Sequence, residues 1–120
     1  ELLREEYAPA LIDSVNLSPV SAGRQRAAVS LHTRGPIEAD LPAYTLRGYT
    51  LHWVLISPDR RIKFSEGDVL LPVLVPGSVW SAEIEWAAPD EEYALMLSIV
   101  RPTGSAVIEK LYNSSGELIP

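Results

Sequence analysis

The stretch "WSAEIEWAA", residues 80–88, alternates between apolar and polar side chains along almost its whole length. In a β-strand, successive side chains point to opposite faces, so this stretch would present one apolar face and one polar face. The apolar face would carry Trp80, Ala82, Ile84 and Trp86, and the polar face Ser81, Glu83 and Glu85. A strand with one buried and one solvated face is typical of an antiparallel sheet that packs on a second layer.

Similar segments follow one another through the rest of the chain, separated by turns rich in glycine and proline. After about residue 10, no segment shows the apolar stripe of an amphipathic helix. We therefore predict an all-β fold, an immunoglobulin-like antiparallel β-sandwich of about seven strands. Residues 1–10 would form a linker or N-terminal extension, and residues 11–120 the domain. The expected strands are 11–17, 26–34, 47–57, 61–65, 78–87, 92–101 and 105–112.

Composition limits the classes of function. The chain has 120 residues, of which 47% are hydrophobic, enough for one compact domain. No apolar run reaches the roughly 18 residues of a membrane-spanning helix, and the net charge of -6 opposes binding to nucleic acid. The absence of cysteine excludes disulfides and thiolate metal sites but leaves the compartment open. Because the chain begins at Glu1 without an initiator methionine, we expect a piece of a longer or processed polypeptide.

Two aromatic residues have the positions of known markers of this fold. Trp53 lies in the third expected strand, within "YTLRGYTLHWVLISPDRRI" (residues 44–62), and we expect it to hold the two sheets together. Tyr93 opens a strand directly after a turn, as in a tyrosine corner, so its hydroxyl should bond to the backbone a few residues upstream. We interpret "SEGD", residues 65–68, as a turn.

Few residues are candidates for catalysis or metal binding. Glu83 and Glu85 would lie roughly 7 Å apart on one strand, close to the spacing of glycosidase carboxylates. On an outward sheet face they would meet solvent, so we expect a polar surface there and not a catalytic pair. His32 and His52 should point outward from opposite sheets, which separates them too far for a shared metal ion. We therefore expect no catalytic residue, cofactor or metal ligand in this chain.

Aromatic side chains are the remaining candidates for binding. Trp53 and Trp86 are in register with aliphatic core residues, and we expect both to be buried. Trp80 begins its strand, so it could form a platform for a glycan or a protein partner. The residues that would form this platform with Trp80 are Tyr44, Tyr49 and Tyr112.

The order of motifs after residue 44 resembles a known kind of accessory domain. A strand with a central Trp53 is followed by a Leu-Pro to Pro-Gly bend at residues 71–77 and an "EYAL" strand at residues 92–95. These features are similar to the immunoglobulin-like β-sandwich domains beside the catalytic barrel of glycoside hydrolase family 2, such as bacterial β-galactosidases. The resemblance covers roughly residues 27–112, and the link at residues 32–49 is longer and richer in proline than in that family. In such enzymes the catalytic glutamates lie in the barrel, so the resemblance transfers no catalytic residue.

The resemblance implies a non-catalytic domain that packs on the catalytic domain of a glycoside hydrolase, fixes its orientation or contributes to a homo-oligomer interface. Two alternatives remain open. One is a glycan-binding module that uses the Trp80 platform. The other is a protein-interaction or adhesion domain that uses an exposed edge strand or the loop "PIEADLPAYTLRG", residues 36–48.

Overall fold

The computed structural model describes residues 10–33 and 45–119, and all the regular structure in these ranges is β-strand. The eight strands are β1 (Ala10–Ser21), β2 (Arg24–Thr33), β3 (Thr50–Ile56), β4 (Lys63–Leu70), β5 (Val79–Ala87), β6 (Ala94–Val100), β7 (Ala106–Asn113) and β8 (Leu118–Ile119). None of the described residues forms a helix that could cross a membrane. The predicted all-β class is confirmed, with β8 as a strand that the sequence did not predict.

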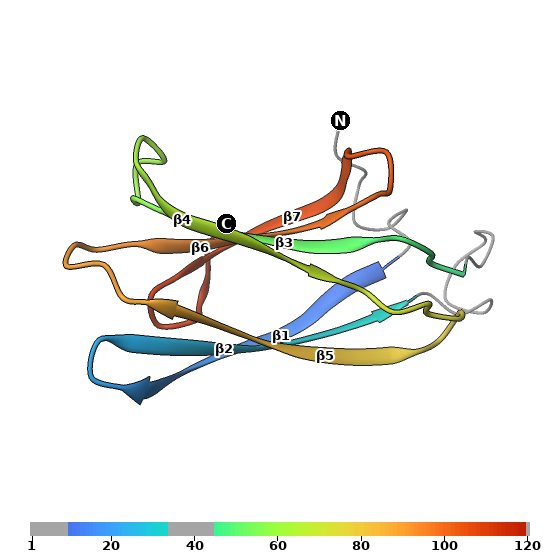
Figure 1. Cartoon of the computed structure of the whole chain (residues 1–120), viewed down its shortest axis with the longest axis horizontal. Helices are drawn as coiled ribbons and strands as arrows, with labels where there is room; N and C mark the ends of the chain where they lie inside the picture. Colours follow the sequence, from blue (N-terminus) through green and yellow to red (C-terminus); the bar gives the residue numbers. More distant parts are fainter. Residues whose placement is uncertain (1–9, 34–44, 120) are drawn as a thin grey trace.

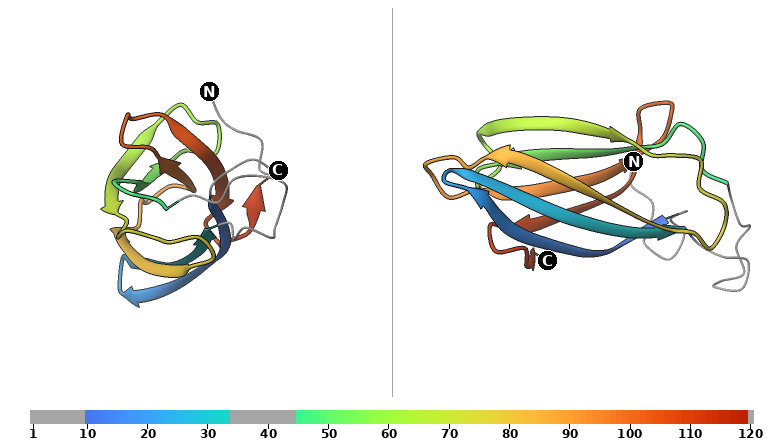
Figure 2. Two further views of the ribbon diagram at one scale, coloured as in Figure 1. Left: turned by 90° about the vertical axis from the view of Figure 1, so that its right-hand side faces the viewer. Right: turned by 60° about the horizontal axis from the view of Figure 1, so that its bottom comes forward.

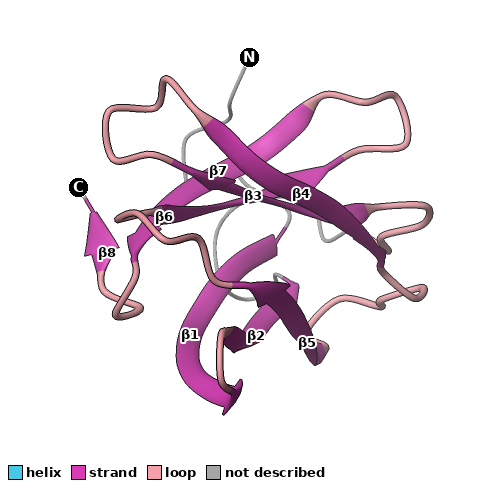
Figure 3. Ribbon diagram, turned by 60° about the vertical axis from the view of Figure 1, so that its left-hand side comes forward, coloured by secondary structure: helices cyan, strands magenta, loops and turns pink. Residues whose placement is uncertain are grey.

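The strands form two antiparallel sheets that face each other (Figures 1 and 3). The smaller sheet has the order β1-β2-β5, and the larger has the order β4-β3-β6-β7-β8. The chain changes sheets between β2 and β3, between β4 and β5, and again between β5 and β6. This is the arrangement of an immunoglobulin-like sandwich, and it makes β4 and β5 edge strands.

The core lies between the sheets, as the alternation in β5 predicts. Along β5, each residue from Val79 to Ala87 is alternately exposed and at least partly buried. The larger side chains that are fully buried come from both sheets and from the bridge at Leu46. They are Val29, Leu31, Leu46, Leu51, Leu55, Leu95, Leu97, Ile99 and Val107. Burial of apolar surface from both layers is the main term that holds such a sandwich together.

Two tryptophans and a tyrosine connect the sheets. The rings of Trp53 in β3 and Trp86 in β5 are 6.2 Å apart, so the contact joins the larger sheet to the smaller. This agrees with the role expected of Trp53, although its ring is only partly buried. The ring of Tyr93 meets Trp86 edge-on at 6.3 Å, and the indole Nε1–H of Trp86 donates a hydrogen bond to the Tyr93 hydroxyl at 3.3 Å. The expected backbone partner of Tyr93 is wrong: among the described residues its hydroxyl bonds to no backbone group and instead accepts the hydrogen bond of the Trp86 indole N–H.

The interpretation of residues 65–68 as a turn is also wrong, since β4 continues through them to Leu70. Gly67 lies directly opposite Trp53 in the antiparallel pair of β4 and β3. A Cβ atom at Gly67 would lie 2.7 Å from atoms of the Trp53 indole, closer than real side chains approach. The glycine therefore makes room for a ring inside a strand and does not mark a turn.

The connection between β4 and β5, residues 71–78, is held firmly at one end of the sandwich (Figure 2). Leu71 and Leu74 are buried, as predicted, and Leu74 pairs with Leu46 through two backbone hydrogen bonds. Residues 75–78 form a tight turn in which Ser78 N–H bonds to the Val75 carbonyl at 3.2 Å. Gly77 has a φ of 82° there, which suits the position after proline in a type II turn.

The side chain of Thr33 fixes the same turn from the end of β2. Its hydroxyl donates a hydrogen bond to the Val75 carbonyl at 2.7 Å and accepts one from the Ser78 N–H at 2.9 Å. Thr33 is fully buried, and the two hydrogen bonds that it makes with the connection are partly buried. The backbone of this connection is therefore tied to both sheets.

Candidate functional site

The predicted aromatic platform does not form one surface among the described residues. Trp80 and Tyr49 are partly buried and pack on the core at the end of the sandwich that carries the β4–β5 connection. Tyr112 is only 7% exposed and lies opposite Leu95, toward the other end of the larger sheet. Along the strands this separates Tyr112, which is level with Leu55, from Tyr49 by roughly 20 Å. Tyr44 lies outside the described residues.

The two histidines lie where the sequence predicts, on the outer faces of different sheets. The imidazole of His32 contacts Asp13 on β1, at 2.6 Å from Nδ1 to the carboxylate. His52 lies between Asp68 and Glu66 of β4. In the part of the chain that the structure describes, no group of histidine and acidic side chains is arranged to hold a metal ion.

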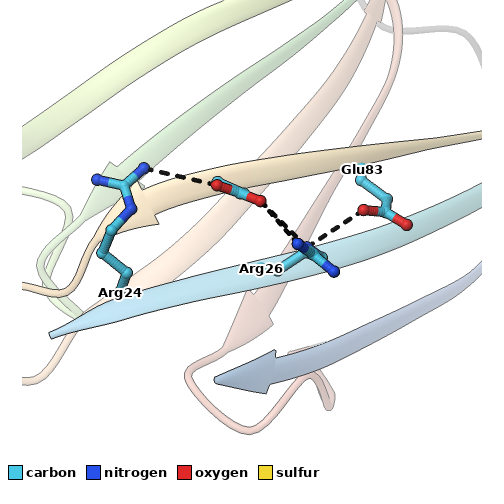
Figure 4. A network of polar contacts seen from close by, with 4 residues as sticks. Arg24, Arg26 and Glu83 are labelled. Atoms are coloured by element: carbon cyan, nitrogen blue, oxygen red, sulfur yellow. Dashed lines mark hydrogen bonds and ion pairs between the residues drawn. The ribbon is translucent and has the colours of Figure 1, made fainter. Parts of the chain in front are cut away.

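Glu83 and Glu85 lie on the outer face of the smaller sheet and pair with arginines of β2 (Figure 4). Arg26 contacts Glu83 at 3.2 Å and Glu85 at 2.9 Å, and Arg24 reaches Glu85 at 3.8 Å. The hydrogen bond with Glu85, and then the charge of Glu83, raise the pKa of Arg26. These exposed carboxylates therefore face guanidinium groups and solvent.

A cleft of about 550 Å³ opens between the edge strands β4 and β5, and we call it the aromatic cleft. Three rings line it, one from each of β3, β4 and β5, and the loop after β5 closes one side. Its charged residues are Arg24, Glu85 and Asp90. The full lining is Arg24, Trp53, Phe64, Ser65, Glu85, Trp86, Ala87, Ala88, Pro89 and Asp90.

A second feature, at the opposite end of the sandwich, is a group of exposed apolar side chains that we call the apolar end. Leu70 and Val79 are 72% and 73% exposed where β4 ends and β5 begins. Val73 and Val75, in the connection between these strands, are 55% and 57% exposed. Because the backbone here is fixed by hydrogen bonds, these side chains are presented to solvent in a defined arrangement.

The outer face of the larger sheet carries a smaller apolar cluster near the β3–β4 hairpin. Val54, Ile56, Ala94 and Leu111 are buried there, with Met96 and Ile119 packed against them. A hollow of about 290 Å³ beside this cluster is lined by residues of β6, β7 and β8 and by Arg60. This sheet therefore buries apolar side chains on both of its faces.

The sequence could not identify the aromatic cleft. Trp53, Phe64 and Trp86 are far apart along the chain, and both tryptophans were expected in the core. Trp86 fits that expectation at 3% exposed, whereas Trp53 packs on the core and also faces the cleft. The one local signal was Gly67, because a glycine inside a strand marks a close approach by a neighbouring group.

No protein family and no curated protein matches this sequence. A putative ApaA protein from Bordetella pertussis has a similar structure, with a TM-score of 0.53, 13% identity, and coverage of 92% of this chain and 95% of that one. An endonuclease/exonuclease/phosphatase from Beutenbergia cavernae matches with a TM-score of 0.52, 16% identity, and coverage of 94% and 25%. A GH3 β-glucosidase from Bifidobacterium adolescentis matches with a TM-score of 0.40, 14% identity, and coverage of 89% and 17%.

At these identities, the first two structures show that the sandwich fold recurs in other proteins. The overlap with the β-glucosidase is too poor to support an argument. The chain spans about a quarter of the length of the endonuclease/exonuclease/phosphatase chain and nearly all of the ApaA chain. The fold thus occurs both as one part of a long enzyme chain and as almost an entire protein.

Proposed function

We propose that this chain is a non-catalytic accessory domain of a larger enzyme, and that it packs against a neighbouring domain through the apolar end. The observation that carries the proposal is the exposure of Leu70, Val73, Val75 and Val79 on a backbone tied to both sheets. Exposed apolar groups of this kind mark interaction surfaces on soluble domains. A fixed backbone also lowers the ordering cost when such a surface is buried.

The enzyme we propose as parent is a glycoside hydrolase. This part of the proposal is supported by the resemblance to accessory sandwiches of family 2 at Trp53, at residues 71–77 and at residues 92–95. The occurrence of the same fold as a quarter of another enzyme chain supports the accessory arrangement. The pairing of Glu83 and Glu85 with arginines supports a chain without an acid-base site of its own.

Sequencing the gene on both sides of this segment tests the identity of the parent. We expect a (β/α)₈ pattern of several hundred residues with glutamates at the ends of its strands. A neighbouring domain of another enzymatic class, or the absence of a catalytic domain, would contradict the assignment to a glycoside hydrolase. Turnover of aryl glycosides by the purified chain alone would refute the non-catalytic role.

A pair of matched substitutions tests the packing role. Val79→Lys places a charge in the apolar end, and Val20→Lys places one at an exposed valine of β1 near the other end of the sandwich. In the isolated chain, both should change the free energy of unfolding by less than about 0.5 kcal/mol. In the whole polypeptide that the gene encodes, only Val79→Lys should lower the melting temperature of the neighbouring domain. Equal effects would contradict the proposal.

If the chain is instead a protein-interaction domain, the apolar end would contact a separate protein molecule and not a neighbouring domain of the same polypeptide. If the isolated chain forms dimers that Val79→Lys dissociates and Val20→Lys does not, then the apolar end serves an interface between copies. Analytical ultracentrifugation of the three proteins makes this distinction.

A further inference from the structure

We propose that the aromatic cleft between β4 and β5 binds a neutral sugar, one or two pyranose rings in length. This inference concerns a different surface from the apolar end and does not depend on the accessory role. The aromatic cleft has a suitable size, because its volume of about 550 Å³ lies within the range of roughly 300 to 1,000 Å³ in which small-molecule sites occur.

The rings in the cleft are held in place before any ligand arrives. Trp86 is fixed by its hydrogen bond to Tyr93, and Trp53 by its close packing over Gly67 and against Trp86. Phe64 packs on the same core from the edge strand β4. Aromatic faces carry partial negative charge and attract the C–H groups on the apolar face of a sugar ring. A rigid set of rings adds affinity because little conformational entropy is lost on binding.

The charges at the rim favour a neutral ligand. Arg24 offers N–H donors, Glu85 and Asp90 offer acceptors, and the Ser65 hydroxyl can do both. An anionic ligand would be opposed by the two carboxylates and by the net charge of -6, and the attraction for a cation is weakened because Glu85 is already paired with Arg24 and Arg26. Each hydroxyl of a sugar both donates and accepts, so a neutral polyol can use this mixed set.

Asp90 is the rim group most available to a ligand. Glu85 already contacts Arg24 at 3.8 Å and Arg26 at 2.9 Å. The carboxylate of Asp90 makes no ion pair or hydrogen bond with any residue that the structure describes. Its neighbour Glu91 lines a separate hollow, beyond Phe64, and is therefore a matched control.

The test is an NMR titration of the 120-residue chain with cellobiose, maltose and lactose, and with digalacturonate and choline as charged probes. The indole N–H signals report on each tryptophan separately. We expect a saturable shift of Trp53 with at least one of the neutral disaccharides at millimolar concentration, and no shift of Trp80. Neither charged probe should match that response.

Three substitutions complete the test. Asp90→Ala should weaken the binding of the best disaccharide about tenfold, whereas Glu91→Ala, with the same change in charge, should leave it unchanged. Phe64→Leu keeps the apolar volume but removes the ring, so it should also weaken binding while the chain stays folded. The proposal is overturned if no sugar shifts Trp53 at about 10 mM, if a charged probe binds better, or if Asp90→Ala and Glu91→Ala have equal effects.

Discussion

The two ends of the sandwich offer different chemistry to a partner. At one end, the last residue of β4, the first residue of β5 and the connection between them expose four aliphatic side chains on a backbone tied to both sheets. Toward the other end, aromatic rings join the sheets and also line a cleft with a charged rim. Exposed aliphatic side chains suit burial by a neighbouring domain, whereas rings with donors and acceptors suit a small polar ligand. The proposed packing surface and the proposed binding cleft thus lie at opposite ends of one sandwich.

The largest expected difference between the two ends is in how much their tryptophans contribute to the free energy of unfolding. Trp86→Ala should lower the free energy of unfolding by about 3 to 5 kcal/mol, because the ring is buried and contacts both Trp53 and Tyr93. Trp80→Ala should cost clearly less, since Trp80 is partly exposed at the apolar end. Urea unfolding of both variants measures this. Equal losses would show that the aromatic contacts between the sheets contribute little.

The next prediction concerns the fit of Gly67 under Trp53. Gly67→Ala should destabilise the chain by about 1 to 3 kcal/mol, because the added methyl group would overlap the indole. The same substitution should cost much less in a Trp53→Phe background, where the smaller ring leaves space. A double-mutant cycle by urea unfolding checks this. If Gly67→Ala costs the same in both backgrounds, the glycine is needed for some other reason.

A smaller effect is expected from the tyrosine hydroxyls at the two ends. Tyr93→Phe should cost about 0.5 to 1.5 kcal/mol, since it removes the acceptor of the buried Trp86 N–H. Tyr49→Phe should be nearly neutral, because the Tyr49 hydroxyl bonds to no other described residue. Thermal unfolding of both variants tests the pair. A Tyr93→Phe variant as stable as Tyr49→Phe would contradict the role of this hydrogen bond.

The smallest expected effect on stability comes from the ionisation of Asp59 in the β3–β4 hairpin, beside the aromatic cleft. Hydrogen bonds from the Ser57 hydroxyl and the Arg61 N–H hold the pKa of Asp59 below its ordinary value of 3.8. Because the pKa is lowered in the folded chain, the stabilisation is complete above the ordinary value and is lost as the pH falls through the lowered one.

An NMR titration of the Asp59 carboxyl carbon measures this pKa directly. Ser57→Ala should raise it toward the ordinary value, because the hydroxyl is the largest cause of the shift. An Asp59 pKa at or above 3.8 in the unsubstituted chain would contradict the hydrogen-bonded hairpin.

Local patterns predicted much of the fold but little of the candidate site. Alternation in residues 80–87 predicted which side of β5 faces the core, and Pro76 with Gly77 predicted the turn that presents Val75. The role of Gly67 was missed because its cause is a ring 14 positions away in the chain and opposite it in the sheet. A cleft between two edge strands depends on which strands end up at the edges, and no local pattern reports that.

The most direct test of the difference between the two ends is hydroxyl-radical footprinting of side chains. The isolated chain is compared with the whole polypeptide that its gene encodes. We predict that Leu70, Val73, Val75 and Val79 are oxidised in the isolated chain and protected in the whole polypeptide, while Val20 is oxidised equally in both. Equal oxidation of the apolar end in both samples would contradict its role as the packing surface.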